Sequence, residues 1–143
     1  MSYTADLLDG LARLIHDAGL GTYRPDGVYA PGETAIAIAA APPAPDRAII
    51  LAAYPVTESA ALTDTTTGVQ VRTRAGADPR DVDRLDDAVF ELLHGAGPFT
   101  FGSARVQLLY RASGAPIGAD SAGRMERSSN YYARAHRAHP NLE

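Results

Sequence analysis

Apolar residues recur at helical spacing in the first segment of the chain, between Thr4 and Ala18. Leucine, isoleucine and alanine side chains return every three or four positions, which is the period of one helix face. Thr4 is placed to cap the first turn, and Asp6 lies where the helix dipole is positive. The pattern predicts an amphipathic helix that ends at the glycines after Ala18 and turns its apolar stripe to a core.

A second helical stripe runs from Val82 to Leu93. Asp78 and Pro79 precede it, and an acidic cap followed by proline is typical of a helix start. Opposite the apolar stripe, this helix carries four aspartates: Asp81, Asp83, Asp86 and Asp87. We expect these carboxylates to form a solvated face and not a metal site, because no second set of ligands accompanies them.

Runs of β-branched and apolar residues predict strands in much of the remaining chain. The clearest alternation places valine and threonine at every second position of segment 65–74, with polar residues between them. A nearly continuous apolar run over 47–56 indicates a central strand. The predicted strands cover residues 34–40, 47–56, 65–74, 99–111 and 124–135, with a short edge piece at 22–24.

Glycine, proline and small polar residues gather in the segments between these elements. They predict loops over 22–32 and 112–123, a connection over 58–64 and a mobile end over 136–143. The element order lacks the strict strand–helix alternation of a doubly wound sheet. We therefore expect one domain over residues 1–143, of the α+β class, with a mostly antiparallel sheet packed by two main helices on one side.

Composition narrows the class of protein. A chain of 143 residues is the size of one domain, and the absence of cysteine excludes disulfides, thiolate metal sites and a cysteine nucleophile. No apolar run reaches the roughly 18 residues of a membrane span, and the first residues are acidic, unlike a signal peptide. We expect a soluble protein that is found in the cytoplasm and has no contact with a membrane.

Charge is unevenly distributed along the chain. Residues 1–99 hold 7 arginines and 14 acidic residues, whereas residues 100–143 hold 6 arginines and 3 acidic residues. Two explanations stay open: complementary surfaces through which copies of the chain meet, or a mildly polarised solvated surface. The net charge of −4 gives little support to direct or sequence-specific nucleic-acid binding.

The sequence contains no recognisable catalytic motif. His136 and His139 lack the acidic ligand that a zinc site needs at fixed spacing, and His16 and His94 are interpreted as helix-end residues. The glycine-rich stretch 95–102 follows a helix and leads into a strand, which is the reverse of a phosphate-binding loop. We expect no enzymatic activity, no cofactor and no metal.

Arginine and tyrosine mark segment 124–132 as a candidate interaction surface, because interfaces favour both side chains. An ordinary exposed edge strand would also account for this segment. The residues alone leave both interpretations open.

Several segments together are similar to a known family. The stretches TGVQVRTRAG, DPRDVDRLDDAVFELLHG, RVQLLYRASG and PIGADSAGRMERSSNYY, in this order, resemble the minor capsid proteins of siphophages, a group similar to tail terminators. The resemblance is strongest from Gly68 to Tyr132. It implies a tail-terminator-like fold.

The resemblance also implies a function. It points to a virion protein of the tail and neck region, assembled in the host cytoplasm, that forms a hexameric ring at the head-proximal end of the tail tube. Such a ring ends tube polymerisation and joins tail to head. Its partners would be other copies of the chain, the tail tube protein, and the head connector or neck proteins.

The residues that match the family in its recognition segment are candidates for an interface. They are Asp120, Arg124, Glu126, Arg127, Asn130, Tyr131 and Tyr132, with Gly118 and Gly123 beside them.

Three other functions remain in view. A head-completion or neck adaptor protein would bind the portal side and form a ring of different order. A small bacterial ligand-binding or regulatory domain would have an enclosed apolar pocket. An enzyme whose site assembles from scattered Asp, His and Arg would show strongly perturbed pKa values in a cleft.

Overall fold

The computed structural model describes residues 2–141 and contains two helices and seven strands. In chain order these are α1 (Tyr3–Asp17), β1 (Thr22–Tyr23), β2 (Ala35–Ile38), β3 (Ala48–Thr57), β4 (Asp64–Arg74), α2 (Pro79–Leu93), β5 (Phe99–Phe101), β6 (Ala104–Ala119) and β7 (Met125–His136). Neither helix is long and apolar enough to span a membrane.

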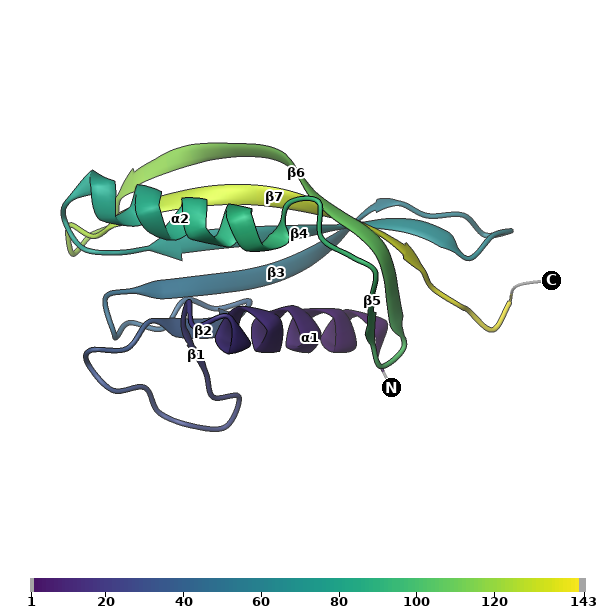
Figure 1. The fold of residues 1–143 in the computed structure, drawn as a ribbon, viewed down its shortest axis with the longest axis horizontal. Helices are drawn as coiled ribbons and strands as arrows, with labels where there is room; N and C mark the ends of the chain where they lie inside the picture. The colour runs from purple at the N-terminus through teal and green to yellow at the C-terminus, as the bar shows by residue number, and fades with distance from the viewer. Residues whose placement is uncertain (1, 142–143) are drawn as a thin grey trace.

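The strands form one curled sheet in the order β1-β2-β3-β4-β7-β6-β5 (Figure 1). The pairs β1–β2 and β2–β3 are parallel, and the other four pairs are antiparallel. The predicted α+β class with a mostly antiparallel sheet is confirmed.

Both helices pack on the same face of this sheet, which we call the helix face. The Tyr3 hydroxyl of α1 lies 2.8 Å from Oγ1 of Thr67, and Ser129 of β7 donates a 2.9 Å hydrogen bond to Asp86 of α2. The apolar side chains of both helices pack against side chains from every second position of the strands and form one apolar core with them. The largest fully buried side chains of this core include Leu7, Leu11, Ile49, Leu51, Leu93, Leu109 and Tyr131.

The helix starts differ in how well the sequence predicts them. Asp78 caps α2 by accepting a hydrogen bond from the backbone N–H of Arg80 at 3.0 Å, and Pro79 opens the helix as predicted. The prediction that Thr4 caps α1 is wrong. The cap is Ser2, two residues earlier, whose hydroxyl accepts a hydrogen bond from the N–H of Ala5 at 3.2 Å, so that α1 begins at Tyr3.

The predicted loop over 112–123 is wrong, because most of it continues β6 along β7 to Ala119. The pairing register shifts at three places, between Val106 and Leu108, Arg111 and Ser113, and Pro116 and Gly118. Such bulges absorb glycine and proline that would otherwise interrupt a ladder. The predicted strand over 99–111 is likewise two strands, β5 and β6, joined by a turn in which Gly102 has a φ of 55°.

β7 lies between β4 and β6, so the interpretation of segment 124–135 as an edge strand is wrong. β7 pairs along its length with β4 on one side and with β6 on the other. The predicted mobile end begins inside this strand at His136. The next residue, Arg137, donates its N–H to the carbonyl of Thr63 at 2.8 Å, while Leu142 and Glu143 lie outside the described residues.

Candidate interface on the β6–β7 hairpin

The pleat of β7 divides the predicted interface residues between two surfaces. Residues 127, 129, 131, 133 and 135 turn to the helix face, and the residues between them turn to the opposite face, which we call the open face. Glu126, Asn130 and Tyr132 therefore lie on the open face. The seven candidates do not form one patch.

Asp120 shapes the turn between β6 and β7. Its carboxylate accepts hydrogen bonds from the backbone N–H groups of Ala122 and Arg124, at 3.0 and 2.8 Å, and from Nε of Arg124 at 2.8 Å. The bond from the backbone of Arg124 holds the pKa of Asp120 below its usual value. Gly118 and Gly123 flank the turn with φ values of 103° and 80°, which suit glycine. These residues define the local conformation of the turn.

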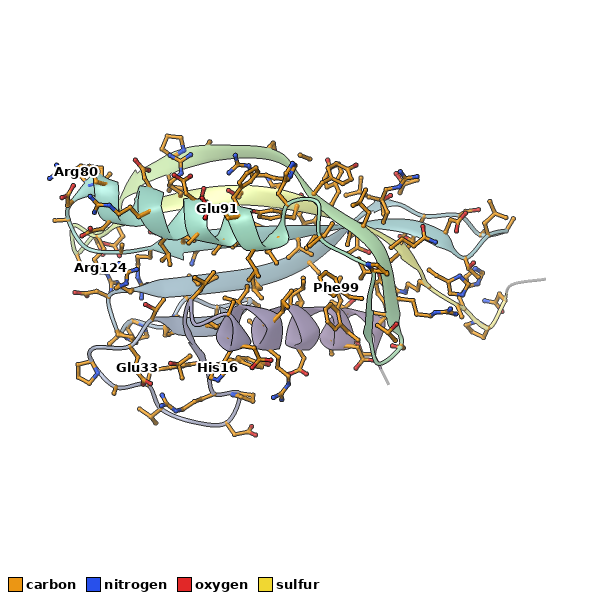
Figure 2. All side chains as sticks on the ribbon, in the orientation of Figure 1. His16, Glu33, Arg80, Glu91, Phe99 and Arg124 are labelled. Atoms are coloured by element: carbon orange, nitrogen blue, oxygen red, sulfur yellow. The ribbon has the colours of Figure 1, made fainter. Side chains whose placement is uncertain are left out.

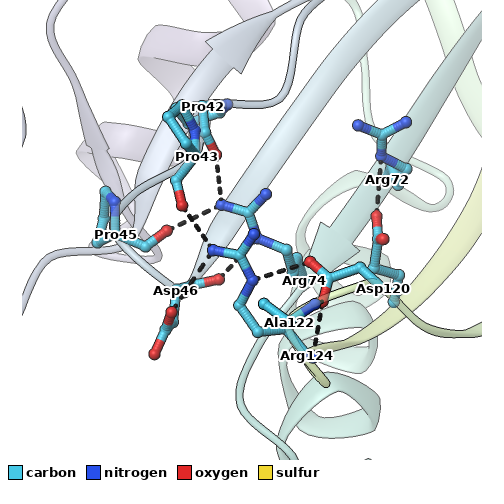
Figure 3. A network of polar contacts seen from close by, with 10 residues as sticks. Pro42, Pro43, Pro45, Asp46, Arg72, Arg74, Asp120, Ala122 and Arg124 are labelled. Carbon is cyan, nitrogen blue, oxygen red and sulfur yellow. Dashed lines mark hydrogen bonds and ion pairs between the residues drawn. The ribbon is translucent and has the colours of Figure 1, made fainter.

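Arg124 and Arg74 tie this turn to a proline-rich loop (Figure 3). Arg124 donates to the carbonyl of Pro43 at 2.7 Å. Arg74 is 3% exposed, and its guanidinium donates to three carbonyl oxygens at 2.7–2.9 Å: those of Pro42, Pro45 and Asp46. Burial lowers the pKa of Arg74, and the nearby Arg124 adds to that effect. The two arginines hold the loop against the end of the sheet.

Arg127 belongs to a polar cluster beneath α2. Nε of Arg127 and Nη1 of Arg111 each lie 3.5 Å from the carboxylate of Asp86, which also accepts the bond from Ser129. Asp86 is 1% exposed, so the prediction that all four aspartates of this helix form a solvated face is wrong for Asp86. Asp83, one turn earlier, is exposed and pairs with Arg127 at 3.1 Å.

Tyr131 is fully buried, whereas both interpretations of this segment, an interaction surface and an exposed edge strand, place it at the surface. Its ring packs in the core, and among the described residues its hydroxyl has no hydrogen-bond partner. Burial raises the pKa of this phenol, with a further contribution from the charge of Asp86. A side chain in this position supports the fold and does not reach a neighbouring molecule.

Tyr132 lies in a row of aromatic residues on the open face. The strand register places Tyr54, Gly68, Tyr132 and Tyr110 side by side across β3, β4, β7 and β6. The rings of Tyr110 and Tyr132 meet edge to face with centroids 5.9 Å apart. The ring of Tyr54 covers Gly68 so closely that a Cβ there would lie 2.2 Å from its Cζ. We call these three tyrosines the tyrosine row.

Sequence reasoning missed Tyr54 and Tyr110 as members of this surface. Each lies on the open face of its strand, but their adjacency depends on a strand register that joins residues 14 to 64 positions apart. The other candidates of the open face make side-chain contacts there. Glu126 pairs with Arg72 at 3.1 Å, and Asn130 donates to the hydroxyl of Ser113 at 3.1 Å.

His16, in the last turn of α1, and His94, the C-cap residue of α2, accept hydrogen bonds from backbone N–H groups. Nδ1 of His16 accepts the N–H of Tyr23 at 2.9 Å, and Nδ1 of His94 accepts the N–H of Arg111 at 3.1 Å. Figure 2 shows His16 on α1, near the loop between β1 and β2. Across residues 2–141, His, Asp and Glu side chains form no group of three that would hold a metal ion.

An open cleft of 490 Å³ lies between the β3–β4 turn and the C-terminal segment. Its lining includes Glu58, Asp64, Arg137 and His139. The guanidinium of Arg137 lies 3.7 Å from the carboxylate of Glu58, and its carbon lies 4.4 Å from the ring centre of Tyr3. This charged, open cleft differs from the enclosed apolar pocket that a small-ligand domain would need.

Comparisons with known proteins give a family match and a likeness of fold. No curated protein matches the chain. A solved structure titled "Virion of native gene transfer agent (GTA) particle" contains a chain of similar fold, with a TM-score of 0.60 at 14% identity, covering 90% of this chain and 91% of that one. The model of the family described as "Bacteriophage tail terminator protein" matches residues 14–137, the greater part of the sequence. The chain belongs to the bacteriophage tail terminator protein family.

Proposed function

We propose that this protein is a non-enzymatic subunit of a phage-type virion that forms a ring at the head-proximal end of the tail tube. There it ends tube polymerisation and joins the tail to the head. The observation that carries this proposal is the family match over residues 14–137. The likeness of fold to a chain of a gene transfer agent virion supports a structural role in a tailed particle.

The physical requirements of this role are modest. One side of the ring must match the last layer of the tube, and the other must reject a further layer by shape or charge. Neither task needs turnover. The polar clusters around Arg74 and Asp86 fit a rigid subunit, because each immobilises an element through hydrogen bonds and ion pairs.

The proposed partners are five further copies of the chain, the tail tube protein, and the head connector or neck proteins. A ring of identical subunits is built from heterologous contacts, in which two different surfaces of each subunit meet. The two faces of this sheet differ in composition, since acidic α2 covers part of one face and arginine and tyrosine mark the other.

The test is to purify the protein and measure its mass by light scattering, alone and with the tail tube protein of the same particle. We expect a species of six times the 15.1 kDa chain mass. Negative-stain electron microscopy should show rings at one end of each tube, and tubes should stop growing when the protein is added.

The tube protein incubated alone, which should give tubes of unlimited length, serves as the control. A protein that remains monomeric with tubes and leaves their length unchanged contradicts the proposal. Rings of another order that bind portal complexes and ignore tubes would identify a neck adaptor instead.

A further inference from the structure

The open face of the sheet has the composition of a contact surface. Tyrosine supplies a large contact area with little conformational entropy to lose, and it is enriched at interfaces. The tyrosine row crosses four strands, and Tyr54 remains 37% exposed. Leu108, on the same face, is also 37% exposed.

Two arginines on the open face lack a side-chain partner among residues 2–141. Arg134 precedes the end of β7 and pairs in register with Leu108, and Arg105 lies opposite His136 on β6. Both are exposed, and within residues 2–141 neither makes an ion pair or a side-chain hydrogen bond. Arg72, in contrast, is paired with Glu126.

The opposite side of the molecule carries the matching charge. Asp87 and Glu91 are exposed and lie four residues apart on α2, on its surface away from the sheet; Figure 2 labels Glu91 there. Neither forms an ion pair within the described chain. Like charges at this spacing slightly destabilise their own helix, so they are more favourable opposite a positive surface.

We propose that the open face of one subunit docks against the outer surface of α2 on the next copy, with Arg105 and Arg134 meeting Asp87 and Glu91 around the tyrosine row. The contact is heterologous, because the two surfaces lie on opposite sides of the chain, and repeating it closes a ring when the rotation between subunits allows closure. The inference rests on the proposed function, and it names the surfaces through which that ring forms.

Charge reversal on each side tests the contact. In the sheet variant, Arg105→Glu and Arg134→Glu make the open face negative. In the helix variant, Asp87→Arg and Glu91→Arg make α2 positive. Each variant alone then brings like charges together at every contact, and we expect the concentration for half-assembly to rise roughly tenfold or more. Mixed in equal amounts, the two variants present opposite charges at every contact of an alternating ring of six.

We therefore expect the mixture to assemble where neither variant does, as measured by light scattering and by native mass spectrometry of the alternating ring. Arg13→Glu, which reverses one exposed arginine of α1 and makes half the charge change of the sheet variant, is the control and should assemble like wild type. Circular dichroism melts of the isolated variants establish that each subunit is folded.

If each variant assembles by itself as wild type does, or if the mixture stays dissociated, the assignment of these two surfaces is overturned. The proposal that the subunits form a ring is unaffected by either result. If the sheet variant forms normal rings that fail to cap tubes, the open face binds the tube. This result also overturns the assignment of the open face to the contact between subunits. A wild-type chain that forms no ring even on tubes removes this inference together with the proposed function.

Discussion

Two buried tyrosines differ in how the protein accommodates their hydroxyl groups. Tyr3 is 7% exposed and its hydroxyl shares a 2.8 Å hydrogen bond with Thr67, whereas the fully buried hydroxyl of Tyr131 has no partner among the described residues. An unsatisfied buried polar group is unfavourable, while a satisfied one contributes about 1 kcal/mol. The same chemical change therefore has different consequences at the two positions.

We expect Tyr131→Phe to leave the free energy of unfolding unchanged or to raise it by up to about 1 kcal/mol. Tyr3→Phe, the matched change, should lower it by about 1 kcal/mol because Thr67 loses its partner. Urea denaturation of both variants measures the difference. A larger loss for Tyr131→Phe than for Tyr3→Phe would mean that the Tyr131 hydroxyl has a partner after all.

Asp86 is the buried aspartate of α2, and its carboxylate contacts Ser129, Arg111 and Arg127. Asp86→Ala leaves Ser129 without its acceptor and Arg111 and Arg127 without their shared carboxylate. The two arginine side chains are 31% and 28% exposed, so solvent moderates the penalty to about 2–3 kcal/mol.

Chemical denaturation of the monomeric subunit measures this penalty, and Asp87→Ala, at the exposed neighbouring position, should change stability by less than about 0.5 kcal/mol. Equal effects at the two positions would contradict the structural role of Asp86. Helical spacing from Val82 and Val89 places Asp86 on the apolar stripe, so the prediction that it lies opposite the stripe overlooked a local signal. The arginines and the serine that surround Asp86 depend on the tertiary structure.

At the scale of elements, the two helices and the strands β2, β3, β4 and β7 were predicted within a few residues. Each of these elements is predicted from the residues of its own segment, which do not depend on distant parts of the chain. The extended β6 was missed, because the composition of segment 112–119 favours a loop and only the ladder with β7, adjusted by bulges, makes it a strand. Tertiary pairing overrides local preference most easily in such weakly biased segments.

The loop between β1 and β2 depends on one carboxylate. Glu33 accepts hydrogen bonds from Arg24 and from the N–H of Ala30, and the bond from Arg24, followed by that from Ala30, lowers the pKa of Glu33 from its usual 4.5 to about 2. Because the folded pKa is lowered, the stabilisation is complete above about pH 4.5 and is lost as the pH falls towards 2.

We expect NMR titration of the side-chain carboxyl carbon to show Glu33 ionised at pH 3, where ordinary glutamates are largely protonated. In Arg24→Ala, the midpoint should move back towards the usual value, since the largest cause of the shift is removed. A wild-type midpoint near 4.5 would show that the contact with Arg24 is not maintained in solution.

At the scale of the whole molecule, the sheet brings together side chains that no sequence window contains. Tyr54 and Tyr132 share one register row through Gly68. The acidic pair Asp87 and Glu91 and the basic pair Arg105 and Arg134 lie on opposite sides of the subunit.

If charged surfaces meet in the ring, its assembly should weaken with salt. The Debye length falls from about 10 Å at 0.1 M to about 3 Å at 1 M ionic strength, which screens the partly exposed arginines and carboxylates at such a contact. We expect the half-assembly concentration, measured by sedimentation, to rise several-fold over this range of sodium chloride. Assembly that strengthens with salt would indicate that apolar contacts dominate instead.

The two amphipathic helices, most strands, the α+β class and the resemblance to tail terminators could be predicted from the sequence, because periodicity, caps and motif order are properties of neighbouring residues. Which polar residues are buried and which share a surface depends on how distant segments pack together. Asp86 and Tyr131 became parts of the core, and Tyr132 joined the tyrosine row, because strand register and helix packing join residues far apart in the chain.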